Sequence, residues 1–187
     1  DERIVFQVLA DERNNAHPDI IVLVADSTNL RRNLLLFSQV ADLGKPMLLV
    51  LNMADMAKKE GISIDVDKLA ERLGVQVVSI SARKEEGIAQ LKKAIAQTTT
   101  VATQNSSVET IDFAPKAIEE IKRKIGVDND YYALQILHQH EHLTFFTAKE
   151  QEEIETIEVS NSFDTVKLQG EETVARYKHL SKVLNDV

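Results

Sequence analysis

Three short apolar runs alternate with amphipathic patterns in the first half of this chain, and that alternation limits its fold more than any other feature of the sequence. The apolar runs occupy residues 20–25, 47–51 and 75–80. The amphipathic patterns occupy residues 30–41, 66–73 and 88–95. Short runs of Val, Ile and Leu are typical of strands buried on both faces, and their alternation with helices predicts a parallel sheet with right-handed crossovers. Three strands are too few for a complete doubly wound sheet, so we expect an incomplete one.

The helices of this half carry end signals. Asp65 precedes the second amphipathic pattern, where its side chain would cap the first turn. Gly44 and Gly74 follow the first and second patterns, at the position where a left-handed residue ends a helix. The polar residues Asp26 and Asn29 stand just before the first pattern, and we expect one of them near the N-terminus of that helix.

The second half of the chain differs in both charge and pattern. Residues 98–112 are mostly polar, have no helical period and predict a linker. Residues 113–187 predict a small helical bundle, and residues 98–187 together hold −7 of the net charge of −8. Expected helices begin at Pro115 and cover residues 130–140 and 146–158. A last helix is expected to carry Val174, Tyr177, Ser181 and Leu184 on one face.

The composition excludes several classes of protein. The 187 residues include no Cys, which excludes disulfides and thiolate metal sites, and no Trp, which argues against a stacking platform for single-stranded nucleic acid. The acidic net charge argues against binding to nucleic-acid phosphates, so no nucleic-acid partner is expected. No run approaches the ~18 apolar residues that cross a membrane.

Polar residues follow two of the expected strands at the sheet edge where open parallel sheets bind ligands. Asn52 and Asp55 follow the second strand, and Ser81 and Ala82 follow the third. A carboxylate at Asp55 can accept both N1–H and N2–H of guanine. The Asn52 amide can face the N7/O6 edge and also tie the two loops together, and the Ala82 backbone N–H can donate to O6. This set of groups predicts guanine recognition, because adenine would leave the site's own hydrogen-bonding groups unpaired.

The first half resembles the G domain of the bacterial ferrous iron transport protein B family, a GTPase fused to a membrane permease. The matching stretches are Asp26–Leu34, Leu51–Asp55, Lys59–Asp65, Leu73–Val75, Ser81–Arg83 and Gly87–Ile88. The second half is similar to the family's helical domain, and Glu172–Tyr177 resembles the segment leading toward its membrane part. The resemblance implies an α/β fold, an incomplete P-loop-NTPase-type G domain in residues 1–97, followed by the linker and the small all-α domain.

The resemblance also implies which residues contact the ligand, GTP or GDP. Asn52, Met53 and Asp55 would form the guanine-specificity loop. Ser81, Ala82 and Arg83 would form the second base-contacting loop. Met53 stands where most GTPases have Lys, which keeps apolar contact with the base but removes a positive charge, so modest affinity is expected. The parent protein would hydrolyse GTP with Mg²⁺ at the cytoplasmic face of the bacterial inner membrane and couple nucleotide state to Fe²⁺ uptake through its own permease region.

The phosphate-binding motif of such proteins is not in this sequence. Its pattern is Gly-x-x-x-x-Gly-Lys-Ser/Thr. The one Gly-Lys pair, Gly44-Lys45, is followed by Pro46, and Gln39 stands at the place of the earlier Gly. We therefore expect the chain to begin just after the second switch of a G domain, with the upstream part either cut away or not included. No catalytic residue is assigned to this chain, and the fragment alone is expected to be inactive.

Two other functions remain open from the residues. One is a fragment of a ribosome-assembly GTPase, which would usually append a basic module. The other is a nucleotide-free interaction module whose sheet is only a scaffold. A metal site is a third reading of His138, His140 and His142, because His138 and His142 would share one face of a helix, but no third ligand is identifiable and no metal site is expected.

Overall fold

The computed structural model describes residues 2–11, 15–98, 108–185 and 187. These residues fall into two compact units. The sheet unit comprises Asp19–Ser107 and Arg176–Val187, and the helical unit comprises Asp1–Pro18 and Val108–Ala175. The expected domain boundaries, 1–97 and 113–187, stay a prediction, and the spatial units group residues 1–18 and 176–187 differently. Most of the expected linker, 98–112, lies outside the described residues.

The sheet unit contains the predicted parallel sheet. Its strands are β1 (Ile21–Asp26), β2 (Met47–Asn52) and β3 (Gln76–Ser79), in the spatial order β1-β2-β3. Both neighbouring pairs are parallel, with Asp26 opposite Asn52 and Leu51 opposite Ser79. All of β2 except its last residue is buried, as expected of a central strand covered on both faces. The strand and helix alternation in the sequence therefore predicted the sheet correctly.

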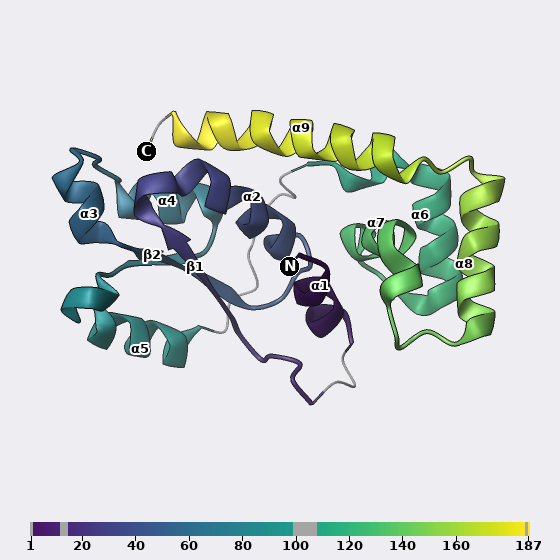
Figure 1. Ribbon diagram of the computed structural model, residues 1–187, viewed down its shortest axis with the longest axis horizontal. Helices are drawn as coiled ribbons and strands as arrows, with labels where there is room; N and C mark the ends of the chain where they lie inside the picture. Colours follow the sequence, from purple (N-terminus) through teal and green to yellow (C-terminus); the bar gives the residue numbers. More distant parts are fainter. Residues whose placement is uncertain (1, 12–14, 99–107, 186) are drawn as a thin grey trace. The chain divides into compact units, whose positions relative to one another are not determined.

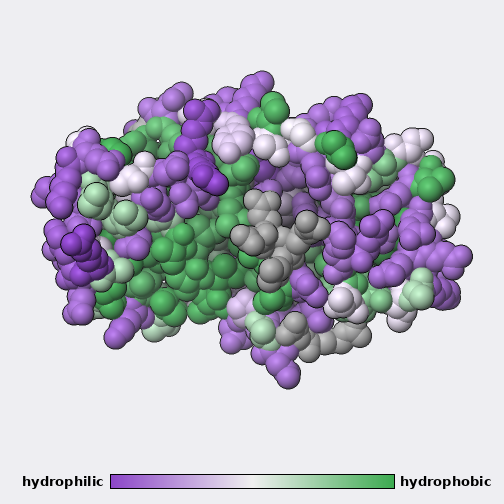
Figure 2. Space-filling model, in the orientation of Figure 1, coloured by the Kyte–Doolittle hydropathy of each residue, from purple (hydrophilic) through white to green (hydrophobic). Residues whose placement is uncertain are grey.

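Helices cover both faces of this sheet. They are α2 (Leu30–Ala41), α3 (Ala54–Lys59), α4 (Val66–Leu73) and α5 (Ile88–Gln97). In Figure 1, α5 lies on the opposite side of the strands from α2 and α4. Leu48, Val50 and Val78 form a buried cluster with Ala94 of α5. On β1, Val22 and Val24 are 36% and 57% exposed. Figure 2 shows a patch of apolar side chains left of the centre of the visible face.

The end signals of α4 and the expected place of Asp26 are confirmed, whereas α2 ends at Ala41 with Asp42 as its C-cap and Gly44 lies two residues beyond that cap, with φ of 69°. Asp65 accepts a hydrogen bond from the Lys68 backbone N–H at 3.0 Å, which caps α4, and Gly74 ends α4 with φ of 63°. Asp26 accepts from the Thr28 backbone N–H at 2.8 Å and caps the 3₁₀ turn Ser27–Asn29 that leads into α2. Each side chain satisfies a backbone donor that the first turn leaves without an internal partner.

The described residues of the helical unit form α-helices joined by shorter helical turns. The α-helices are α1 (Glu2–Ala10), α6 (Pro115–Ile121), α7 (Asp130–Gln139), α8 (Ala148–Ser160) and the first half of α9 (Thr165–Leu184). Pro115 opens α6, and α7 and α8 confirm the helices expected over 130–140 and 146–158. The sequence analysis did not predict α1, which is held by a Phe6–Tyr132 ring contact at 5.5 Å and by the Tyr132 hydroxyl donating to the Ala10 carbonyl oxygen at 2.7 Å. Among the described residues, no helix has the length and apolar content needed to span a membrane.

The expected last helix is confirmed as α9, and its buried residues include an arginine. Val174 is 69% exposed, whereas Arg176, Leu180 and Val183 are buried. The Arg176 Nη1 atom lies 2.7 Å from Asp42 Oδ2, and both side chains are almost fully buried in the sheet unit. The sequence alone did not indicate the burial of Arg176, because charged residues are normally exposed, and here a buried partner compensates the charge.

Candidate functional site

The polar residues predicted at the sheet edge lie together. The last residue of β2 is Asn52, and α3 begins at Ala54 immediately beyond it. The Ile80 backbone N–H donates to the Leu51 carbonyl oxygen at 2.8 Å, and the Ala54 backbone N–H donates to the Ile80 carbonyl oxygen at 3.1 Å. These bonds join the two strand ends, so the loop after β2 and the loop after β3 are held side by side.

Asn52 ties the two loops together. Its side-chain Oδ1 accepts a hydrogen bond from the Ala82 backbone N–H at 3.1 Å. The sequence analysis assigned this tying role to Asn52 and also expected the Ala82 N–H to be a donor for a guanine O6. In the structure that N–H is directed at Asn52, so a base oxygen would have to share or replace this bond.

Ser27, in the 3₁₀ turn directly after β1, supports the same site. Its hydroxyl donates to the Asn52 carbonyl oxygen at 2.6 Å, and the residue is only 3% exposed. Sequence reasoning did not single out Ser27. The available signal was its position directly after the first strand, at the edge where the other polar residues follow theirs.

Asp55 is held by two side chains from the neighbouring loop. The Ser81 hydroxyl donates to Asp55 Oδ1 at 2.9 Å, and Lys84 Nζ lies 3.8 Å from Asp55 Oδ2. The Asp55 side chain is 8% exposed. The Ser81 hydrogen bond and, secondarily, the Lys84 charge lower the pKa of Asp55, which keeps the carboxylate ionised and acceptor-only.

The remaining predicted site residues flank this pair of loops. Met53 has φ of 63°, a left-handed conformation that is uncommon outside glycine, and it is 39% exposed. This turn reverses the chain between Asn52 and α3. Arg83 is exposed within the 3₁₀ turn Ala82–Lys84. Ligand contacts by Met53 and Arg83 stay predictions.

The loop after β3 is closed on itself. The Ser81 and Glu86 backbones exchange two hydrogen bonds, both 3.1 Å long, so residues 82–85 between them cannot open away without breaking both. Gly87 follows with φ of 79°. A Cβ at this position would lie 2.5 Å from the Ser79 carbonyl oxygen, so only glycine fits here without a backbone shift.

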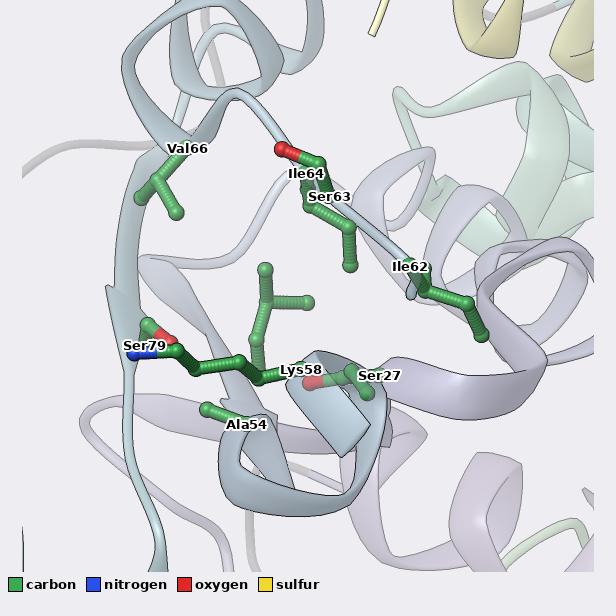
Figure 3. A pocket seen from close by; sticks show the side chains of 10 residues that line it. Ser27, Ala54, Lys58, Ile62, Ser63, Ile64, Val66 and Ser79 are labelled. Carbon is green, nitrogen blue, oxygen red and sulfur yellow. The ribbon is translucent and has the colours of Figure 1, made fainter. Parts of the chain in front are cut away.

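A pocket of about 210 Å³ lies between α3 and the 62–66 segment. In Figure 3, the Lys58 side chain runs from α3 along this pocket toward Ser79. The pocket is smaller than the ~300–1,000 Å³ typical of small-molecule sites. We therefore do not assign this pocket as a ligand site.

The three neighbouring histidines occupy different environments. His138 packs on the Phe163 ring with centroids 5.2 Å apart, His140 Nδ1 lies 3.4 Å from Glu158 Oε1, and His142 is exposed. The α-helix α7 ends at Gln139, before His142, so the i, i+4 arrangement of His138 and His142 on one α-helical face does not form. Within the described parts of the chain, no three His, Asp or Glu side chains are grouped to hold a metal ion.

Because His138 is buried, we expect the folded protein to lose stability in acid. Burial lowers its pKa from 6.5 to about 4, so between these values the unfolded chain binds more protons and the free energy of unfolding falls as pH falls. At pH 5 the loss from this group is about 2 kcal/mol. Urea unfolding measures the free energy of unfolding at pH 7 and at pH 5. Between these two pH values the wild type should lose about 2 kcal/mol more of this free energy than His138→Leu. Equal losses in the two proteins would contradict this assignment.

The model of a family described as ferrous iron transport protein B matches residues 1–95. The cytosolic domain of L. pneumophila FeoB matches with a TM-score of 0.72 and 28% identity, over 99% of this chain and 72% of that chain. An S. thermophilus NFeoB mutant bound to GDP matches with a TM-score of 0.68 and 30% identity, over 97% of this chain and 71% of that chain.

A more distant structure shows the same fold. The cytosolic domain of T. maritima FeoB in its GMPPNP form matches with a TM-score of 0.69 and 22% identity, over 97% of this chain and 72% of that chain. Among curated proteins, none matches the chain. The parallel sheet flanked by helices is therefore shared with G-domain structures.

Proposed function

The chain belongs to the ferrous iron transport protein B family, and from this premise we propose that its sheet unit recognises a guanine nucleotide through Asn52, Asp55 and Ala82. The observation that carries the proposal is the joining of the two strand-end loops by the Asn52–Ala82 and Asp55–Ser81 hydrogen bonds. The GDP in the S. thermophilus structure and the GMPPNP in the T. maritima structure support the ligand class.

Each group has a role that its chemistry suits. The ionised Asp55 carboxylate accepts N1–H and N2–H of guanine, and the Ala82 backbone N–H donates to O6. Ser81 donates to Asp55 Oδ1 and orients the carboxylate, while leaving lone pairs for the base because a carboxylate has about four acceptor positions. Met53 and Arg83 contact the faces and edge of the base from the two loops. Adenine presents an amino group to the Ala82 donor and lacks the N2 donor, so it is rejected.

The wider role follows from the family. The parent protein is a GTPase whose nucleotide state controls Fe²⁺ transport through its own permease region, and the chain lies at the cytoplasmic face of the bacterial inner membrane. Mg²⁺ would accompany the nucleotide, but the described residues offer no cluster that fits it. We therefore assign no step of hydrolysis to these residues and limit their role to reading the base.

Calorimetric titration of the full-length natural protein with GDP and with ADP tests the proposal. GDP is expected to bind at least ~100-fold more tightly than ADP, because the mismatched base leaves buried hydrogen-bonding groups unpaired. Similar affinities for the two nucleotides would contradict guanine recognition. A nucleotide-free interaction module would bind neither.

A further inference from the structure

Lys84 occupies a position that the base would also need. Its Nζ lies 3.8 Å from Asp55 Oδ2, beyond hydrogen-bond distance but within the range of an ion pair. Oδ1 of the same carboxylate already accepts from Ser81 at 2.9 Å, so Oδ2 is the oxygen with more free acceptor capacity. A guanine base on Asp55 would direct one of its N–H groups at this oxygen.

The loop itself fixes Lys84 at this place. The Lys84 backbone N–H donates to the Ser81 carbonyl oxygen at 3.1 Å, inside the span that the Ser81–Glu86 bridge closes. The Lys84 side chain is 48% exposed and the Asp55 side chain 8% exposed, so the ammonium approaches Asp55 from the solvent side. A ligand that enters from solvent to reach Asp55 therefore meets this ammonium.

We propose that Lys84, in the loop after β3, competes with guanine for the Asp55 carboxylate and so weakens nucleotide binding. This inference rests on the proposed function. The neutral N–H groups of guanine and the charged lysine ammonium are both donors directed at the same oxygen, so the two compete for it. Guanine binding requires the ammonium to move aside, and the exposed, flexible lysine stem allows this. The Asn52–Ala82 bond adds a second internal contact that the base must share or replace.

The test compares the affinity of the full-length natural protein for GDP after Lys84→Met and after Lys92→Met. Lys92 is an exposed lysine of α5 in the same unit, so its substitution removes the same charge from a place away from Asp55. We expect Lys84→Met to bind GDP about threefold more tightly than wild type, the size expected for a partly exposed ion pair, and Lys92→Met to be unchanged. Lys84→Arg should restore wild-type affinity.

Salt dependence separates competition from a general effect on the loop. Lys84→Met should exceed the wild type in GDP affinity by a smaller factor at 0.5 M salt, because salt screens the Lys84–Asp55 ion pair of the wild type. Equal or weaker GDP binding by Lys84→Met, compared with Lys92→Met, would overturn the inference while leaving guanine recognition intact. A wild type that does not distinguish GDP from ADP would overturn the proposed function and this inference with it.

Discussion

Asp55→Asn is expected to weaken GDP binding by about 100-fold and to make xanthosine diphosphate the preferred diphosphate. The substitution replaces an acceptor of two N–H groups with an amide that presents its own NH₂ to one of them. Loss of hydrogen bonds to a charged group costs ~1.5–3 kcal/mol each, and ~2.7 kcal/mol corresponds to 100-fold. Xanthine carries a carbonyl in place of the N2 amino group, and this carbonyl accepts from the new amide.

The fold should tolerate this change. The amide has the same shape as the carboxylate, and its oxygen can still accept from the Ser81 hydroxyl that now donates to Asp55. Asp67→Asn, at an exposed carboxylate in the first turn of α4, is the matched control and should leave both affinities unchanged. The affinities are measured by titration of the full-length natural protein. Unaltered GDP affinity in Asp55→Asn would show that Asp55 does not read the base.

Gly87→Ala is expected to destabilise the sheet unit by ~3 kcal/mol. The new Cβ would lie 2.5 Å from the Ser79 carbonyl oxygen and 3.2 Å from the Ile80 Cα atom, both of which belong to the backbone. The residue also has φ of 79°, which costs a non-glycine residue ~1–2 kcal/mol. Relief of the contact requires movement of the end of β3 or of the Ser81–Glu86 loop, so GDP affinity should fall as well.

Gly61→Ala separates the two contributions. Gly61 has φ of 75°, but a Cβ there meets no atom within 4 Å. Gly61→Ala should therefore lower the free energy of unfolding by only ~1–2 kcal/mol, the cost of holding a non-glycine residue at positive φ. Urea unfolding of both variants measures the difference. If Gly87→Ala and Gly61→Ala lose the same stability, the close approach of Gly87 to β3 does not constrain the loop.

The sheet and its helix ends were predictable because their causes are local in sequence. The three apolar runs, the Asp65 cap and the Gly74 stop each act within a few residues, and all of them agree with the structure. The buried face of α9 was not predictable in the same way. Arg176 is buried only because Asp42, 134 residues earlier, lies beside it, and a periodicity argument treats any arginine as exposed.

The sequence predicted the proximity of the candidate site residues better than their individual contacts, and their contacts with a ligand stay a prediction. The rule that polar residues at parallel strand ends meet at one edge placed Asn52, Asp55, Ser81 and Ala82 together. The contacts of Ser27 and Lys84 depend on how the loops turn, which their residue types do not determine. The direct Asn52–Ala82 bond also depends on closure of the loop by the Ser81–Glu86 bridge.

The amide signal of Ala82 in a ¹⁵N-labelled protein tests the central claim most directly. Recognition of guanine by this site predicts that GDP shifts the Ala82 amide proton, because its hydrogen bond to Asn52 Oδ1 is shared with or replaced by one to O6. ADP at the same concentration should leave that signal in place. A GDP titration that leaves Ala82 unmoved while signals elsewhere shift, or an ADP titration that moves Ala82 equally, would contradict guanine recognition by these loops.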